Sequence, residues 1–174
     1  MKEKKIIIAI SGASGVNLGL KTIEKLPSDM QKHIIATENA KVVLRKEKHI
    51  YDDLDISAPT ASGSFGADMM IIAPCSMNTL AKIACGIADN LTTRSASVMI
   101  KEQKKLLLAP RELPFSAISL ENMLKLSRLG VIIAPPVMGY YADVKNLDEM
   151  ENFIIGKWFD LLGIENNLYK RWQG

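Results

Sequence analysis

The stretch Lys5-Ile-Ile-Ile-Ala-Ile-Ser-Gly-Ala-Ser-Gly15 joins an isoleucine-rich run to a loop of small residues. A continuous apolar run that ends at turn residues predicts a strand buried on both faces, as in a parallel sheet. Residues 16–26 then alternate apolar and polar side chains at helical spacing and end at Pro27. A strand, a small-residue loop and a helix in this order predict the first unit of an α/β fold.

The loop itself suggests an anion site. Gly12 and Gly15 let the backbone come close to a ligand, and the free amides at a helix N-terminus attract groups such as phosphate. The pattern Gly12-Ala-Ser-Gly15 is neither the dinucleotide fingerprint nor a P-loop, since no Gly-Lys-Ser/Thr follows it. The Gly12-Ala-Ser-Gly15 pattern favours a loop that binds a phosphate-bearing ligand, and the alternative is a tight turn between strand and helix that binds nothing.

Composition excludes several classes of protein. With 174 residues, 48% hydrophobic and 24% charged, the chain predicts a single globular domain. A net charge of +3 is too small to indicate nucleic-acid binding. The apolar runs are too short to cross a bilayer, and the N-terminus leads straight into a strand, so we expect a cytoplasmic protein. Two cysteines and two histidines predict neither a disulfide framework nor a zinc site.

The rest of the chain repeats the alternation of strand and helix. We expect further strands at 33–36, 69–73, 105–109 and 131–134. We expect helices at 37–48, 78–85, 91–102, 119–129 and 146–163, with residues 51–66 as a loop and 164–174 as a C-terminal tail. Thr37, Ser119 and Asn146 are the expected caps of three of these helices. The pattern predicts a three-layer, Rossmann-like or flavodoxin-like parallel sheet with helices on both faces, in one domain over 1–174.

Ligands of such sheets bind beyond the carboxyl ends of the strands. That rule selects the loops at Gly12, Thr37, Gly63 to Gly66, Cys75 to Thr79, Arg111 to Pro114, and Tyr140 to Tyr141. Arg111 and Glu112 follow a buried strand and lie between two prolines, so we expect them to be held at this edge; a surface salt bridge is the alternative. Ser76 either caps a helix or presents the helix amides to a ligand.

Other candidates are weaker. Cys75 has no histidine near it in sequence, and buried thiols are usually inert, so nucleophilic catalysis is disfavoured. The run Asp52-Asp-Leu-Asp55 could be a truncated magnesium motif but is better interpreted as a solvated surface. Glu38 could hold a dinucleotide ribose only if the glycine fingerprint were present.

Seven motifs occur in an order that resembles one family. They are Gly12-Ala-Ser-Gly15, Ser62-Gly-Ser-Phe65, Ala73-Pro-Cys-Ser-Met-Asn-Thr-Leu80, Asp89-Asn-Leu-Thr-Thr-Arg94, Arg111-Glu-Leu-Pro114, Pro135-Pro-Val137 with Tyr141, and Arg171-Trp-Gln-Gly174. As a set they cover essentially the whole chain and resemble the flavin prenyltransferase family of the UbiX type.

The resemblance implies an activity. Such proteins transfer a dimethylallyl group from dimethylallyl phosphate to N5 and C6 of reduced FMN, and a partner decarboxylase receives the prenylated FMN. It also implies a metal-independent reaction and a homo-oligomer, a dodecamer by family resemblance, with active sites at subunit interfaces. It further implies a link to ubiquinone biosynthesis. A decarboxylase similar to the flavin-containing cysteine decarboxylases and a non-catalytic FMN carrier are the alternatives. The decarboxylase alternative is disfavoured, because those decarboxylases have a catalytic histidine in the loop that corresponds to residues 62–65, and this chain has none there.

The resemblance also implies roles for individual residues. The expected FMN contacts are Gly12, Ala13, Ser14, Thr37, Ser76, Met77, Asn78, Thr79 and Arg111. The expected catalytic residues are Ser14, Glu47, Lys101, Glu112 and Tyr141. The expected substrate-binding residues are Arg94, Lys101, Tyr141 and Lys157 for the phosphate, and Phe65 and Trp172 as aromatic faces for the allyl cation.

Physical chemistry agrees with a reaction that uses no metal. Each cation at contact with a departing phosphate is worth on the order of 4 kcal/mol at an effective dielectric near 20. Three positions depart from the family pattern: Lys157 replaces the usual Arg and lacks its bidentate fork, Thr37 replaces Ser, and Asn78 replaces Lys. The segment between Glu47 and Ser62 is also shorter than usual.

Overall fold

The computed structural model describes residues 3–12, 14–36, 44 and 47–172. Its centre is a six-stranded sheet in the order β3-β2-β1-β4-β5-β6, and every neighbouring pair is parallel. The strands are β1 (Lys5–Ala9), β2 (Gln31–Ala36), β3 (Ile50–Asp52), β4 (Met69–Cys75), β5 (Lys105–Pro110) and β6 (Ile132–Ile133). The parallel sheet expected from the sequence is confirmed.

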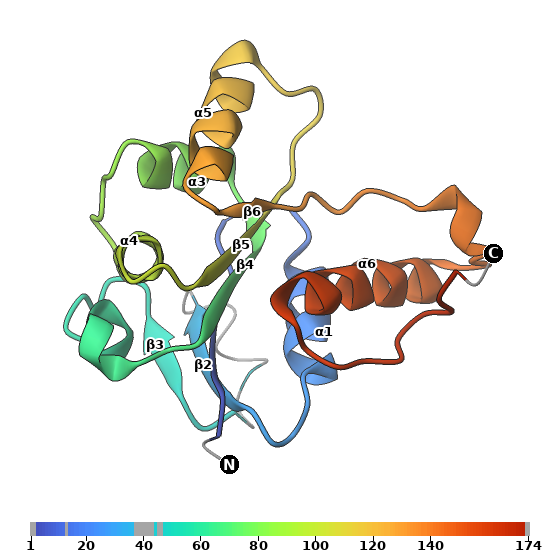
Figure 1. The fold of residues 1–174 in the computed structure, drawn as a ribbon, viewed down its shortest axis with the longest axis horizontal. Helices are drawn as coiled ribbons and strands as arrows, with labels where there is room; N and C mark the ends of the chain where they lie inside the picture. Colours follow the sequence, from blue (N-terminus) through green and yellow to red (C-terminus); the bar gives the residue numbers. More distant parts are fainter. Residues whose placement is uncertain (1–2, 13, 37–43, 45–46, 173–174) are drawn as a thin grey trace.

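Helices cover both faces of this sheet (Figure 1). One face carries α1 (Val16–Lys25) and α6 (Leu147–Leu162). The other carries α3 (Met77–Ala84), α4 (Leu91–Lys101) and α5 (Ala117–Arg128). Three short 3-10 helices complete the elements: η1 (Pro59–Ala61), η2 (Gly63–Phe65) and η3 (Tyr140–Ala142). None of the helices in the described ranges is long and apolar enough to cross a membrane.

The isoleucine run of β1 explains this three-layer arrangement. Ile6 and Ile8 belong to the core under α1 and α6, while Ile7 and Ala9 belong to the core under α3, α4 and α5. All four side chains are at most 1% exposed. Because both faces of the strand are covered, an unbroken apolar run is stable here where an alternating one would bury polar groups.

Two strand predictions need correction. Residues 51–66 were expected to form a loop, but Ile50–Asp52 pairs with β2 as the edge strand β3, and η1 and η2 follow it. A three-residue edge strand with a polar end carries too little periodicity to be recognised. Pro74 was expected to end its strand, yet it lies inside β4, at an irregularity in the pairing with β5 where a missing amide donor is tolerated.

The helix predictions fare better. Asn146 caps α6, as expected, and Asn90 caps α4. The fifth helix begins earlier than expected, because Ser116 rather than Ser119 is its cap and accepts a hydrogen bond from the Ser119 amide at 3.1 Å. The helix expected at 37–48 falls mostly outside the described residues; of its described positions Leu44, Glu47 and Lys48, none is helical.

The loop of residues 63–66 was placed at the wrong edge of the sheet. It precedes β4, and Lys5 at the start of β1 donates from Nζ to the carbonyl of Phe65 at 3.1 Å. Lys5 also stacks over the Phe65 ring at 4.4 Å. The loop therefore lies beyond the amino ends of the strands, opposite the edge where ligands of parallel sheets bind.

A buried histidine lies at the same amino edge. The His33 side chain is 4% exposed, and its Nδ1 lies 3.0 Å from the Tyr51 hydroxyl. Its ring stacks on His49 at 4.7 Å and meets the Phe65 ring edge-on at 4.7 Å. Burial above all, and then the nearby charges of His49 and Lys5, lower the pKa of His33 to about 4.

We expect this histidine to make stability depend on pH. The unfolded chain binds a proton near pH 6.5 and the folded chain only near pH 4, so stability falls as pH drops through that window. The loss should be on the order of 2 kcal/mol. His33→Phe should remove that part of the slope, which urea unfolding at pH 7.5, 5.5 and 4.5 will measure. Equal slopes for both proteins would contradict the prediction.

Candidate functional site

Three loops meet where the central strands end. Ser11, after β1, donates from Oγ to the Pro74 carbonyl at 3.0 Å and accepts from the Ser76 amide at 2.8 Å. On the other side of β4, the Arg111 amide donates to the Cys75 carbonyl at 3.2 Å. The loops after β1 and β5 therefore flank the end of β4. Ser11 was not among the predicted site residues, although a polar residue ending an apolar strand could have indicated it.

The first of these loops has room and donors for an anion. A Cβ placed on Gly12 would meet no atom within 4 Å, and Gly15 has a left-handed φ of 108° that side chains rarely adopt. Within the described chain, α1 begins without a side-chain cap, whereas α3, α4, α5 and α6 each have one. A phosphate at this position would pair with amides that lack a side-chain partner. The residues present therefore fit a phosphate-bearing cofactor.

The loop after β4 serves first to begin a helix. Ser76 Oγ accepts from the Thr79 amide at 3.1 Å and donates to Thr79 Oγ1 at 2.9 Å, so its hydroxyl is a helix cap. Thr79 is 7% exposed. Met77 is half-buried, and Asn78 is exposed. The Ser76 amide donates to Ser11, so the side chains of Met77 and Asn78 are the accessible parts of this motif.

Cys75 is not an active nucleophile in this arrangement. Its side chain is fully buried at the end of β4. Burial raises the pKa of the thiol to about 12, so the thiolate is absent at neutral pH. The inert packing role that the sequence favours is the one the geometry supports.

Arg111 and Glu112 are exposed side chains at the end of β5. Neither makes an ion pair within the described ranges, so the salt bridge considered as an alternative is not formed there. One Glu112 carboxylate oxygen accepts from the amide of Leu113 at 3.2 Å. A cation and a carboxylate are thus left facing solvent beside the end of β4, on the side of β5.

A second group of predicted residues lines a cavity beside the segment of residues 134–146, which joins β6 to α6 and is called the arm here. The chain leaves β6, runs outward through η3 and returns as α6, and the C-terminal tail runs back along α6 (Figure 1). Between η3, α6 and the tail lies a cavity of about 840 Å³. Tyr141, Lys157 and Trp172 all line it, although they come from three separate segments. The structure brings these three predicted phosphate and allyl contacts together.

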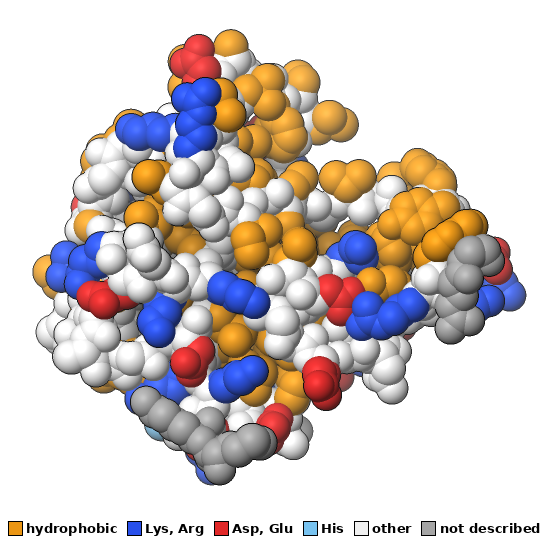
Figure 2. Space-filling view, in the orientation of Figure 1, with side chains coloured by type: hydrophobic (Ala, Val, Ile, Leu, Met, Phe, Trp, Pro, Cys, Tyr) orange, Lys and Arg blue, Asp and Glu red, His pale blue; other side chains and the backbone are white. Residues whose placement is uncertain are grey.

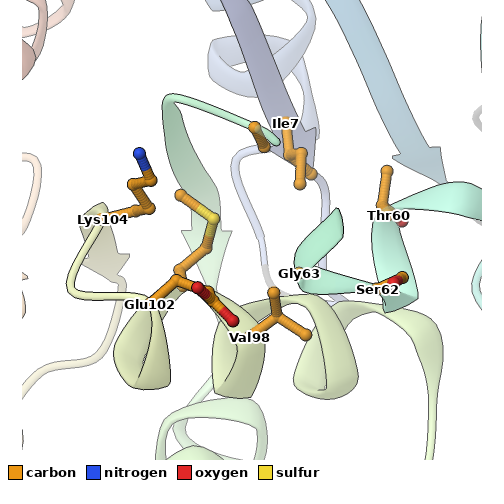
Figure 3. A pocket seen from close by; sticks show the side chains of 9 residues that line it. Ile7, Thr60, Ser62, Gly63, Val98, Glu102 and Lys104 are labelled. Atoms are coloured by element: carbon orange, nitrogen blue, oxygen red, sulfur yellow. The ribbon is translucent and has the colours of Figure 1, made fainter. Parts of the chain in front are cut away.

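A third group lies on the flank formed by α4 and the 3-10 helices. Arg94 donates from Nε to the Ala61 carbonyl at 3.1 Å, and Lys101 forms an ion pair with Glu102. Phe65 lies on η2 at the amino edge, as described above. The pocket between η2 and α4 has a volume of about 10 Å³, room for one water molecule (Figure 3). Arg94, Lys101 and Phe65 are not among the residues that line this pocket.

Of the remaining predicted residues, the structure describes Glu47 and Ser14. Glu47 is half-buried just before β3, and its amide donates to the Leu44 carbonyl at 2.9 Å. Ser14 is exposed in the loop before α1. Ala13 and Thr37 fall outside the described residues. In the part of the chain that the structure covers, no cluster of His, Cys, Asp or Glu is arranged to hold a metal ion.

One chain therefore carries three separate groups of predicted site residues. The carboxyl edge holds Gly12, Ser14, the Ser76 motif, Arg111 and Glu112. The arm cavity holds Tyr141, Lys157 and Trp172, and the α4 flank holds Phe65, Arg94 and Lys101. Sequence reasoning missed Asp160, which binds the tail beside the arm cavity. The sequence did contain a signal for this contact: Asp160 is an acidic residue near the end of an expected helix, and Tyr169 and Arg171, which can donate hydrogen bonds to it, follow in the tail.

Comparisons with known proteins agree with this geometry. Residues 1–158 match the family model described as Flavoprotein. A protein of Campylobacter jejuni named flavin prenyltransferase UbiX is 48% identical, over 97% of this chain and 98% of the relative. A crystal structure of AnUbiX (PadA1) in complex with FMN and dimethylallyl pyrophosphate has a TM-score of 0.93 and 34% identity, over 99% of both chains. A structure described as a dodecameric FMN-dependent UbiX-like decarboxylase from Escherichia coli O157:H7 has a TM-score of 0.91 and 36% identity, over 98% of this chain and 100% of that one.

Proposed function

Because this chain belongs to the flavin prenyltransferase family of the UbiX type, we propose that it prenylates reduced FMN. A dimethylallyl group passes from dimethylallyl phosphate to N5 and C6 of the flavin, and the product serves a partner decarboxylase. The observation that carries this proposal is the loop at Gly12, which is open and begins α1 without a side-chain cap, at the same sheet edge as Ser76 and Arg111. The chain around it matches a flavin prenyltransferase over almost its full length.

The carboxyl edge is the proposed flavin site. Gly12 and the amides that open α1 would hold the FMN phosphate, with Ala13 and Thr37 as further contacts. The Ser76 backbone, Asn78 and Arg111 would orient the ring system. When bound, the reduced flavin would supply two electron-rich atoms, N5 and C6, that bond to different carbons of the dimethylallyl group. The carbon–oxygen bond to phosphate would break, and a base would accept the proton lost from C6. The protein contributes position and charge rather than a nucleophile of its own.

Cations and proton carriers complete the proposed reaction. Arg94, Lys101 and Lys157 would neutralise the departing phosphate, and Tyr141 would donate a hydrogen bond to it. Glu112 and Ser14 would move a proton to the phosphate oxygen, and Glu47 is the second carboxylate assigned to the site. Phe65 and Trp172 would offer ring faces to the allyl cation. No step in this scheme requires a metal ion.

The proposed active site is completed by other copies of the chain, because the cations lie apart from the flavin loops in one copy. Apolar side chains gather on the outer side of α5 and on the arm (Figure 2). They are Ile118, Leu120 and Leu124 on α5, Leu129 at its C-cap, and Val137, Met138, Tyr140 and Tyr141 on the arm, all more than half exposed. Such patches indicate contact surfaces. A homo-oligomer, with the dodecamer of the bacterial relative as the specific expectation, would bring the three groups together.

The experiment that tests this function is direct. Purified protein is incubated without oxygen with reduced FMN and dimethylallyl phosphate, and the flavin is analysed by mass spectrometry. We expect a flavin that has gained one five-carbon prenyl unit, formed equally well in the presence of EDTA. Omitting the donor is the control. Unchanged FMN, under conditions in which the flavin is demonstrably reduced, would overturn the proposal.

The cytoplasm is the proposed location, because the chain has no helix suited to a membrane in its described ranges and acts on soluble phosphates. The decarboxylase that receives the product is proposed from the chemistry of prenylated FMN alone. A flavin-dependent decarboxylation by this chain itself is not supported, since residues 62–65 contain no histidine.

A further inference from the structure

We propose that Asp160 is a positioning residue that docks the C-terminal tail onto α6 and thereby builds the wall of the arm cavity that binds the prenyl phosphate. The inference rests on the proposed function for the identity of the ligand. The docking itself is read from contacts in the structure. Asp160 is in the last turn of α6, away from the flavin loops.

Three tail side chains converge on the Asp160 carboxylate. Arg171 donates from Nη1 to Oδ2 at 2.9 Å and from Nη2 to Oδ1 at 2.7 Å, a bidentate pair. Asn166 donates from Nδ2 to Oδ1 at 2.9 Å, and Tyr169 donates from its hydroxyl to Oδ2. These donors hold the pKa of Asp160 at about 2, so the carboxylate is charged throughout the physiological range.

The fold prepares a seat for this tail. A Cβ on Gly156 would lie 2.5 Å from Cδ1 of Tyr169, so the glycine lets the Tyr169 ring lie directly on α6. The Tyr169 ring meets Phe153 edge-on at 5.2 Å, and Phe153 meets Tyr141 in the same way at 5.8 Å. A row of three rings thus connects the docked tail to η3.

The tail in turn places charge and aromatic surface at the cavity. The ammonium of Lys157 lies 5.9 Å from the centre of the Tyr169 ring, and Arg171 lies 5.4 Å from it. Trp172 follows Arg171 directly and lines the cavity with Tyr141 and Lys157. If the tail detaches, Lys157 loses its ring partner and Trp172 leaves the cavity. Asp160 acts through these residues and does not itself line the cavity.

The experiment uses Asp160→Asn in the full-length protein, which keeps the side-chain volume and removes the charge. We expect the KM for dimethylallyl phosphate to rise at least about fivefold, while FMN affinity and the unfolding temperature stay near those of the parent. Arg171→Gln should have the same effect, and the double variant should be no worse than either single one, because both remove one interaction. Asp29→Asn, the same change at an exposed aspartate between α1 and β2 that does not line the cavity, is the matched control and should leave KM unchanged.

A readout independent of activity separates this inference from the proposed function. Trp172 on the tail is 79% exposed and Trp158 is buried in α6, so a change in the mobility of the tail changes the anisotropy of tryptophan fluorescence through Trp172. Asp160→Asn should lower that anisotropy even if the protein forms no prenylated flavin. Unchanged anisotropy would overturn the docking role. Lowered anisotropy with an unchanged KM would overturn the role in phosphate binding, and equal losses of FMN affinity and prenyl-donor affinity would reduce Asp160 to a general structural residue.

Discussion

Gly19→Ala should destabilise the protein by about 3 kcal/mol or more, the upper part of the range for overpacking. A Cβ at this position of α1 would lie 2.3 Å from the carbonyl oxygen of Ala73 in β4 and 3.3 Å from Ile10 Cγ1. The nearest of these atoms belongs to the backbone of a central strand, so it cannot turn away as a side chain could. The gain of about 1 kcal/mol in helix propensity is too small to compensate. Because domains are stable by only about 5–15 kcal/mol, a substantial part of the free energy of unfolding would be lost.

Urea unfolding at neutral pH measures this effect through the midpoint and the slope. Asn17→Ala, on an exposed position of the same helix, and Gly12→Ala, whose new Cβ meets no atom within 4 Å, are the matched controls. Both should change the free energy of unfolding by no more than about 0.5 kcal/mol. A Gly19→Ala protein as stable as these controls would mean that α1 does not pack on β4 as the structure has it.

Glu112→Gln should slow adduct formation at least about tenfold, at the low side of general acid–base contributions, and leave FMN bound. The amide keeps the size of the side chain and can no longer carry a proton between the flavin and the departing phosphate. Because Glu112 is exposed at the end of β5 and forms no ion pair within the described ranges, the change should cost little stability. The rate is measured in single-turnover reactions with reduced FMN and saturating dimethylallyl phosphate.

Glu121→Gln is the matched control, since it is the same change at an exposed position of α5. It should retain the parent rate. FMN binding by the Glu112 variant, measured by flavin fluorescence, separates loss of chemistry from loss of the cofactor. A fully active Glu112→Gln protein would remove this carboxylate from the mechanism.

The sequence predicted which residues belong to the site but not which of them lie together in one chain. The motifs predicted six substrate contacts, and three of them, Tyr141, Lys157 and Trp172, line one cavity in the structure. The other three, Arg94, Lys101 and Phe65, do not line that cavity. Motifs also grouped Phe65 with the flavin loops, but that ring lies at the opposite edge of the sheet in the same chain. The order of motifs along a chain does not show at which edge of the sheet a residue lies. Nor does it show whether two residues of one active site come from the same copy of the chain.

The sequence by itself determined the layers of this protein. The unbroken run of Ile6 to Ile8, the loop at Gly12 and the caps at Asn90 and Asn146 are local features, and local features act through periodicity and hydrogen bonds to neighbouring residues. The tertiary structure decided the docking of the tail on Asp160 and the close approach of α1 to β4 at Gly19. Both depend on pairs of atoms far apart in sequence, whose distance is fixed only when the sheet and helices have packed.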